Sequence, residues 1–264
     1  MLLSWPFVLW SARIAMIILS DETADIPTPS GMMRMHVFRP AIAGRFPGIV
    51  LFSEIYQVTA PIRRLAAMMA GLGHVVCVPE VYHEYEPAGT VLAYDRPGTD
   101  RGNFLKHEKP LAAYDHDARA ALDWLESCPH CTGALATMGV CLGGHLAFRA
   151  ALDPRVRATV CFYATDIHAH SLGHGRCDDT LARVGEMKGE AFLVWGRQDP
   201  HVPFAGRQMI RDALEQACTR YEWHEFNAQH AFLRDEGHRY DSALFLQCMD
   251  MARAFLGRIM HLSA

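Results

Sequence analysis

One cysteine lies in a setting that makes its thiol a candidate nucleophile. Residues 139–144 have the sequence GVCLGG, which places Cys141 between small residues, after an apolar run and before a run with helical spacing. A tight strand-to-helix turn that presents a nucleophile needs small neighbours, because larger side chains collide within the turn. The N–H groups at the start of the next helix favour a thiolate. The alternative is a buried structural cysteine in a glycine-rich turn.

An acid and a base follow Cys141 in the chain order that such a turn requires, nucleophile then acid then base. Asp199 lies in the segment GRQDP after an apolar run at residues 191–196, and His230 lies in NAQHAF after residues 221–226. Open parallel sheets place their sites at the carboxyl ends of strands. We therefore predict a catalytic triad of Cys141, Asp199 and His230. Taken singly, the last two also fit a turn residue and a surface histidine.

The elements that would position this triad alternate between strand-like and helical patterns. Apolar runs predict strands at residues 48–53, 75–79, 134–139, 158–162, 191–196 and 221–226. Apolar residues three and four apart predict helices at residues 60–72, 111–127, 144–152, 206–218 and 242–260. This alternation is typical of an α/β protein whose mostly parallel central sheet has helices on both faces.

The remaining segments are predicted to be a hairpin and two long loops. Residues 21–40 favour an antiparallel edge hairpin, and residues 83–109 and 165–188 are expected to be irregular. Loops of this length in a compact domain usually cap a site. We expect one domain over residues 17–264 behind an N-terminal extension at residues 1–16.

Composition and charge exclude several classes of protein. In 264 residues, 25 Lys and Arg stand against 29 Asp and Glu, and no five like charges are adjacent, so nucleic acid is not an expected partner. Eight cysteines are too few for a disulfide scaffold. Arg13 interrupts the first apolar stretch and no basic residue precedes it, which argues against a membrane span or a secretory signal. We expect a cytoplasmic monomer or weak homodimer.

Four segments together resemble the dienelactone hydrolase family of the α/β-hydrolase fold. They are FSEIYQ at residues 52–57, the segment around Cys141, GRQDP at residues 196–200, and HAFLR at residues 230–234. The resemblance extends from about residue 16 to the C-terminus. It implies a hydrolase of small esters or lactones that needs no cofactor, with the triad named above.

The resemblance also assigns roles beside the triad. It implies that Glu54 is the acidic residue that controls the thiol, and that the backbone N–H groups of Leu142 and Ile55 form the oxyanion hole. A carboxylate near a thiolate disfavours thiol ionisation, so Glu54 would keep Cys141 protonated at rest or accept its proton. The alternative is that Glu54 pairs with Arg63.

The substrate pocket departs from the family pattern at one position. The family holds a substrate carboxylate with two arginines, and Arg234 matches one of them. The other belongs to the pattern P-x-x-Y-x-R, which is PEVYHE here, with Tyr82 kept and Glu84 in place of arginine. This reversed charge predicts a neutral or weakly anionic ester or lactone, unless Arg96 or Arg101 supplies the missing cation.

The sequence also leaves other functions and sites to consider. Within enzymes, the alternative is a thioesterase or general carboxylesterase. From another class, the alternative is a thiol redox sensor that uses Cys141 without catalysis. Residues 128–131 have the sequence CPHC, but no second such pair follows, and the histidines of residues 168–174 lack a carboxylate at helical spacing. We therefore expect no metal.

Overall fold

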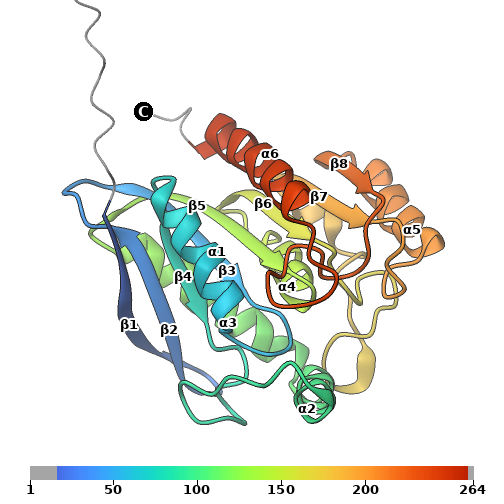
Figure 1. The fold of residues 1–264 in the computed structure, drawn as a ribbon, viewed down its shortest axis with the longest axis horizontal. Helices are drawn as coiled ribbons and strands as arrows, with labels where there is room; N and C mark the ends of the chain where they lie inside the picture. Colours follow the sequence, from blue (N-terminus) through green and yellow to red (C-terminus); the bar gives the residue numbers. More distant parts are fainter. Residues whose placement is uncertain (1–16, 261–264) are drawn as a thin grey trace, which may run out of the picture.

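The computed structural model describes residues 17–260, which form an eight-stranded sheet with helices packed on it (Figure 1). The strands are β1 (Ile18–Thr28), β2 (Gly31–Pro40), β3 (Phe46–Phe52), β4 (Val75–Pro79), β5 (Cys131–Val140), β6 (Val156–Phe162), β7 (Glu190–Gly196) and β8 (Arg220–Phe226). The helices are α1 (Ala60–Gly71), α2 (Arg96–Glu108), α3 (Leu111–Ser127), α4 (Leu142–Ala150), α5 (Phe204–Gln216) and α6 (Ser242–Met260). The extension predicted at residues 1–16 lies outside the described residues.

The sheet is mostly parallel, with an antiparallel edge. Its strand order is β1-β2-β4-β3-β5-β6-β7-β8. Strand β2 pairs antiparallel with both β1 and β4, whereas every pair from β4 to β8 is parallel. The mixed α/β architecture expected from the sequence is therefore confirmed, and the edge hairpin is present, although it begins at Ile18 rather than at residue 21.

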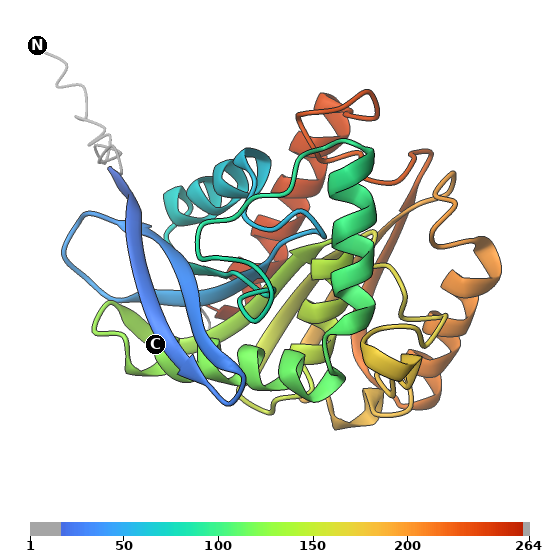
Figure 2. The same ribbon diagram turned by 90° about the horizontal axis from the view of Figure 1, so that it is seen from below.

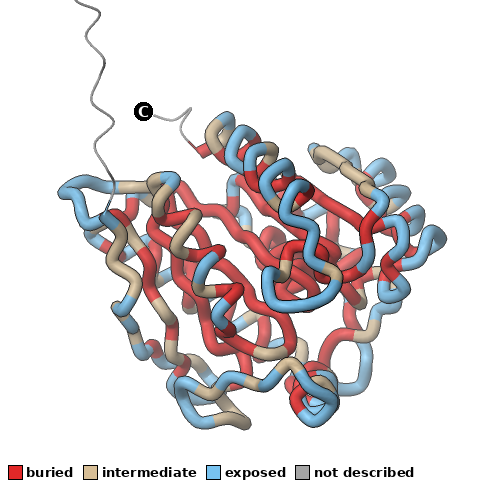
Figure 3. The backbone as a smooth tube through the Cα atoms, in the orientation of Figure 1, coloured by how far each residue is buried: buried red, intermediate tan, exposed pale blue. Residues whose placement is uncertain are grey.

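Helices cover both faces of the sheet. Turned by 90°, the molecule shows α1 and α6 on one face and α3 and α4 on the other (Figure 2). The central strands are therefore buried along nearly their whole length, as the coloured backbone shows (Figure 3). Strands covered on both faces need nearly continuous apolar sequence, which is why their apolar runs could be recognised.

Helix α2 corrects the prediction that residues 83–109 are irregular. Asp95 precedes the helix and its carboxylate accepts a hydrogen bond from Gly98 N at 2.8 Å, while proline fills an early helical position. The helix packs through glycine: a Cβ on Gly102 would lie 2.5 Å from Ile55 O. Glycines occupy two of the buried positions of this helix, Gly98 and Gly102. Apolar residues three and four apart, which would predict a helix, are therefore missing from this segment.

The second long segment, residues 165–188, contains two short 3₁₀ turns, at His174–Arg176 and Val184–Glu186. Within residues 17–260, no helix combines the length and the apolar character needed to cross a bilayer.

Candidate active site

Cys141 lies in a strained turn between β5 and α4. Its backbone has φ 57° and ψ −123°, a conformation that non-glycine residues rarely adopt. The chain can turn this sharply only because the residues two positions before and after Cys141 have no side chain: a Cβ on Gly139 would lie 2.0 Å from Gly143 O, and one on Gly143 would lie 2.1 Å from Phe52 O. The small residues of the sequence motif are therefore a steric requirement of the turn.

Backbone hydrogen bonds hold this turn in place. Cys141 N donates to Phe162 O at 3.1 Å, and Cys141 O accepts from Gly144 N at 3.0 Å and from Thr165 N at 3.2 Å. Backbone strain of this kind costs about 1–3 kcal/mol and persists only where surrounding structure fixes it. The thiol is consequently presented at one defined position, largely buried at the bottom of a cavity.

The predicted acid and base come together beside this cysteine. Asp199 follows β7 and His230 follows β8, so adjacent parallel strands deliver both side chains to the same edge of the sheet. His230 Nδ1 lies 2.7 Å from Asp199 Oδ2, and Asp199 Oδ1 accepts a hydrogen bond from His201 N at 2.8 Å. An ionised carboxylate only accepts hydrogen bonds, so Nδ1 is the donor to Asp199. This leaves Nε2 for the interaction between the His230 and Cys141 side chains.

The environment of His230 favours its protonated form. Burial opposes the imidazolium charge, but negative charge on Cys141 and the hydrogen bond to Asp199 outweigh it, and the pKa of His230 rises to about 10. Aromatic rings fix the imidazole from two sides, Tyr163 with its centroid at 5.1 Å and His201 at 4.6 Å. This arrangement suits a thiolate–imidazolium pair.

Glu54 lies in the same cavity, beyond the end of β3. It is 3% exposed, accepts a short hydrogen bond from the Tyr94 hydroxyl, and has Arg234 Nη1 3.6 Å from its Oε2. Burial raises the pKa of this carboxyl, although Tyr94, Arg234 and His230 act in the opposite direction. The cation opposite Glu54 is thus Arg234, which rules against the alternative pairing with Arg63.

Arg63 is engaged elsewhere. It lies 3.0 Å from His36 Nδ1, donates to Ser20 O at 3.0 Å and faces Asp21 at 3.8 Å.

The two residues predicted to form the oxyanion hole approach Cys141 from different strands. Leu142 is the first residue of α4, and N–H groups in the first turn of a helix have no partner within it. Ile55 follows β3 and lines the same cavity as Cys141. Strands β3 and β5 are direct neighbours in the sheet, so their carboxyl ends bring these two backbone segments together.

The cavity above Cys141 has a volume of about 370 Å³. Its wall combines residues after β3, one side of α2, and the loops after β6, β7 and β8. The side chains are those of Glu54, Ile55, Tyr56, Thr99, Asn103, Lys106, Cys141, Thr165, Asp166, His168, Ala169, His201, His230, Ala231, Arg234, His238 and Arg239. Lys106 and Asp166 form an ion pair within this wall, with Nζ 3.0 Å from both carboxylate oxygens.

Tyr82 and Glu84, predicted to contact substrate, do not line this cavity. Tyr82 is fully buried and its hydroxyl donates to Gly102 O at 3.2 Å. Glu84 Oε1 accepts a hydrogen bond from Lys109 Nζ at 2.6 Å. The structure therefore brings neither side chain to the cavity, because Tyr82 bonds to α2 and Glu84 bonds to Lys109 instead.

Arg96 and Arg101, considered as replacement cations, also have partners elsewhere. Arg101 pairs with Glu86 at 2.6 Å, and the exposed Arg96 faces Asp100 at 3.6 Å. Neither is among the residues that line the cavity.

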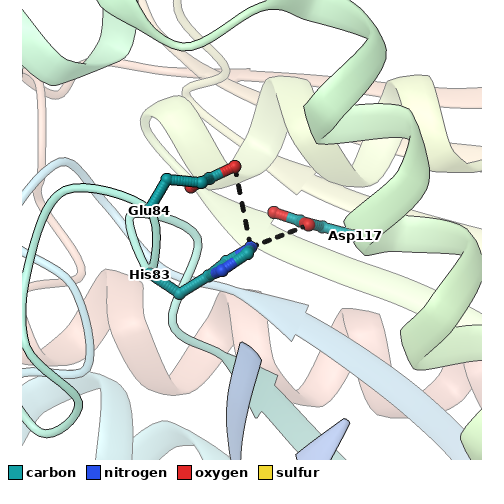
Figure 4. Close-up of side chains that lie close together, drawn as sticks. All are labelled: His83, Glu84 and Asp117. Atoms are coloured by element: carbon teal, nitrogen blue, oxygen red, sulfur yellow. Dashed lines mark hydrogen bonds and ion pairs between the residues drawn. The ribbon is translucent and has the colours of Figure 1, made fainter. Parts of the chain in front are cut away.

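Three further side chains with ligand atoms meet beside Glu84. His83 Nε2 lies 3.0 Å from Asp117 Oδ1 and 3.6 Å from Glu84 Oε1 (Figure 4). The buried ammonium of Lys109 bonds both carboxylates, with Asp117 Oδ2 at 2.6 Å. A buried cation thus already pairs with both acids, and the group is best described as a buried ion-pair network.

Several residues in or beside the cavity were not predicted from the sequence. Tyr94, Lys106 and Asp166 lie in segments predicted to be loops, and their partners are far away in sequence. The capping aspartate and early proline of α2 were the available signal, since they mark a helix start whose next turns carry Thr99, Asn103 and Lys106. For His201, the sequence offered only a weaker indication, namely that it lies two residues after Asp199.

Fold and site together define an α/β-hydrolase with Cys141 in the strained turn between β5 and α4. Residues 33–258 match the dienelactone hydrolase family. The chain belongs to this family, and is a hydrolase of ester or lactone bonds.

Individual relatives carry names from the same family. A Saccharomyces cerevisiae protein named "Putative carboxymethylenebutenolidase" is 42% identical over 245 residues, covering 88% of this chain and 89% of the relative. The carboxymethylenebutenolidase of Pseudomonas putida is 27% identical over 195 residues, 74% of this chain and 78% of its own. The crystal structure of a "Putative Dienelactone Hydrolase" from Klebsiella pneumoniae superposes with a TM-score of 0.77 at 20% identity, over 92% of this chain and 99% of that chain.

Proposed function

We propose that the protein hydrolyses small esters or enol-lactones through a Cys141–His230–Asp199 triad and an acyl-thioester intermediate. The observation that carries this proposal is the 2.7 Å contact between Asp199 and His230 in the cavity where the strained turn presents Cys141. A structural cysteine needs neither an oriented histidine nor a strained backbone.

The chemistry proceeds in two halves. The Cys141 thiolate attacks the carbonyl carbon, a C–S bond forms, and the carbonyl oxygen becomes an oxyanion. The tetrahedral intermediate collapses as the C–O bond to the leaving group breaks, and His230 Nε2 gives its proton to the departing oxygen. Water then adds to the thioester while His230 takes its proton, and cleavage of the C–S bond releases the acid. Asp199 stabilises the imidazolium throughout.

The oxyanion is stabilised by the N–H groups of Leu142 and Ile55. Their elements are fixed by the sheet, so these donors need no reorganisation as charge develops. Removing one such donor in a comparable site costs about 2.7–4 kcal/mol of activation free energy. Because thiolate is itself a good leaving group, the intermediate advances fastest when the substrate releases an enolate or phenolate.

Glu54 controls the ionisation of the thiol in this proposal. An ionised Glu54 disfavours a thiolate nearby, whereas a protonated Glu54 does not. Burial raises the pKa of Glu54, so the carboxyl can take up a proton more readily than an exposed glutamate when substrate alters its contact with Arg234. If this is right, Glu54→Gln raises the rate at which iodoacetamide alkylates Cys141, and an unchanged rate contradicts the role.

The charges in the cavity favour a neutral or weakly anionic substrate. Lys106 is neutralised by Asp166 and Arg234 faces Glu54, so among the described lysines and arginines of the cavity only Arg239 has no acidic partner. We expect kcat/KM for a dienelactone and for its methyl ester to agree within about threefold. A preference of more than about tenfold for the free acid contradicts this specificity.

The test of the function is turnover of a panel of p-nitrophenyl and enol esters by the wild type and by Cys141→Ala. The wild type should hydrolyse them with a burst, and mass spectrometry of a quenched reaction should find the acyl group on Cys141. The alanine variant should lose turnover. If the wild type hydrolyses no ester but consumes one equivalent of peroxide, the protein is a thiol redox sensor.

A further inference from the structure

A second cavity lies beside the catalytic one, on the other side of Glu54 and Arg234. Its volume is about 180 Å³. Apolar and aromatic side chains form most of its wall, namely Pro61, Ile62, Leu65 and Met68 of α1, with Val140, Tyr163, Leu233, Tyr240 and Phe245. Its charged lining residues are Glu54, Arg64, Arg234 and Asp235.

This apolar cavity adjoins the reacting groups. Glu54 and Arg234 line both cavities, so the two spaces share a wall. Val140 is bonded directly to Cys141 through the backbone, and Tyr163 packs its ring edge-on against His230, 5.1 Å between centroids. A group bonded to the Cys141 sulfur is therefore within a few bonds of the apolar cavity.

The shared wall is not closed by a hydrogen bond. Arg234 Nη1 and Glu54 Oε2 are 3.6 Å apart, beyond hydrogen-bonding distance, and the guanidinium lies over the Tyr94 ring at 4.2 Å. The buried Arg234 Nε has no hydrogen-bond partner among the described residues. A group that enters between these side chains must separate the ion pair, but it breaks no hydrogen bond between them.

The outer wall, in contrast, is rigid. Arg64 on α1 donates to both Asp235 oxygens at 2.6 Å and to Glu236 at 2.8 Å, which ties the loop after His230 to the helix. The apolar lining residues Ile62 and Leu65 are almost fully buried. The cavity is thus formed before any ligand enters, as is usual for small-molecule sites.

We propose that this cavity is the acyl subsite of the enzyme and takes an unbranched aliphatic or small aromatic acyl group. The inference rests on the hydrolase function proposed above and names its substrate class. His230 must protonate the leaving oxygen, so the leaving group lies on the polar side of the first cavity, near His201. The acyl group then extends past Glu54. At about 30 Å³ for each water-sized group, the subsite holds about six carbon atoms.

The test compares p-nitrophenyl esters of acetate, butanoate, hexanoate and decanoate, which differ only in the acyl chain. For the wild type, kcat/KM should rise by about fourfold per buried methylene up to about hexanoate and then stop rising. Met68→Trp fills the cavity and should lower the hexanoate-to-acetate ratio at least fivefold. Phe245→Ala enlarges it and should move the optimum to a longer chain.

The controls change exposed hydrophobic side chains away from the apolar cavity. Met209→Phe on α5 and Leu246→Ala on α6 change residues that are 47% and 64% exposed, and both should keep the wild-type ratio. The ratio is independent of the amount of active enzyme, so partial unfolding does not imitate the effect. Circular dichroism verifies that each variant folds.

The outcomes separate the two proposals. If the wild type hydrolyses none of the esters, the hydrolase mechanism itself fails. If acetate is hydrolysed but chain-length preference is flat, or is identical in Met68→Trp and the wild type, the acyl subsite is wrong and the mechanism stands. A preference that follows the alcohol rather than the acyl group, measured with alkyl esters of one acid, places the leaving group in this cavity and overturns the assignment.

Discussion

Glu54 and Arg234 form an ion pair in the wall that the catalytic cavity shares with the apolar cavity, with Arg234 Nη1 3.6 Å from Glu54 Oε2. Arg234 is held over the ring of Tyr94, whose hydroxyl donates to the same carboxylate. The carboxyl is nevertheless so deeply buried that its pKa is raised above the ordinary value of 4.5. The loss of its proton is therefore costly to the folded state, which has consequences for stability.

Glu54→Gln should remove part of the pH dependence of stability. A group whose folded pKa is raised binds its proton more tightly in the folded state. Its contribution to stability is complete below about pH 4.5 and is lost as pH rises through the folded pKa. The free energy of unfolding, measured with urea from pH 4.5 to 8, should fall less steeply in the variant than in the wild type.

The control for this prediction is a glutamate whose pKa is shifted in the opposite direction. Arg183 lowers the pKa of the exposed Glu186 through their hydrogen bonds, so its contribution is present above pH 4.5 and is lost as pH falls. Glu186→Gln should leave the slope above pH 5 unchanged. Equal slopes in Glu54→Gln and the wild type would show that the buried carboxyl carries no such cost.

Asp199→Asn should slow catalysis and shift its pH dependence. The hydrogen bond to Asp199 helps raise the pKa of His230 to about 10, and an amide cannot stabilise the imidazolium in the same way. The basic limb of kcat/KM, where His230 loses its proton, should move from near pH 10 to lower pH. The rate should fall by about 10³–10⁴. The matched control is Asp212→Asn on the exposed side of α5, with a wild-type profile expected.

The sequence was sufficient for the elements whose burial leaves a simple pattern. Central strands such as β3 and β7 are covered on both faces, so their apolar runs are continuous. The triad could be predicted because three short motifs follow three strands in a fixed order, and parallel strands bring such ends together. The turn at Cys141 was recognisable because close backbone contacts allow only glycine around it.

The rest of the site depends on contacts that have no local signature. Two buried positions of helix α2 are Gly98 and Gly102 rather than apolar side chains, so the apolar period that marks a helix is missing. Tyr94 reaches Glu54 across 40 positions of sequence, and no spacing rule predicts that contact. Glu84 was expected in the pocket because of its place in a motif, yet Lys109 draws it into a buried network instead.

Gly139→Ala should disrupt the turn that presents the nucleophile. The added Cβ would lie 2.0 Å from Gly143 O and 2.2 Å from its carbonyl carbon, and backbone atoms cannot move aside as side chains do. Overpacking costs of about 1–3 kcal/mol are expected in the free energy of unfolding, with loss of ester turnover. Gly257→Ala on α6 is the control, because its Cβ would meet nothing within 4 Å. It should stabilise the helix by about 0.5–1 kcal/mol. Wild-type activity in Gly139→Ala would contradict the steric account.

Lys109→Met tests whether the network of Figure 4 serves stability rather than substrate binding. Lys109 is fully buried and donates to Val81 O at 2.8 Å, as well as to Glu84 and Asp117 at 2.6 Å. Removing the ammonium leaves two carboxylates without their cation, so unfolding by urea should be easier by about 3–5 kcal/mol. Lys188→Met, which changes an exposed lysine, should have no measurable effect.

The double variant Lys109→Met/Asp117→Asn distinguishes this ion pairing from general damage. It removes one of the orphaned charges, so its cost should be smaller than the sum of the two single costs by about 0.5–3 kcal/mol. Strict additivity would show that Lys109 and Asp117 do not interact. Because the network does not line the catalytic cavity, KM of folded Lys109→Met should stay within about twofold of wild type. A large rise in KM with unchanged stability would instead restore Glu84 to the substrate pocket, where the sequence motif had placed it.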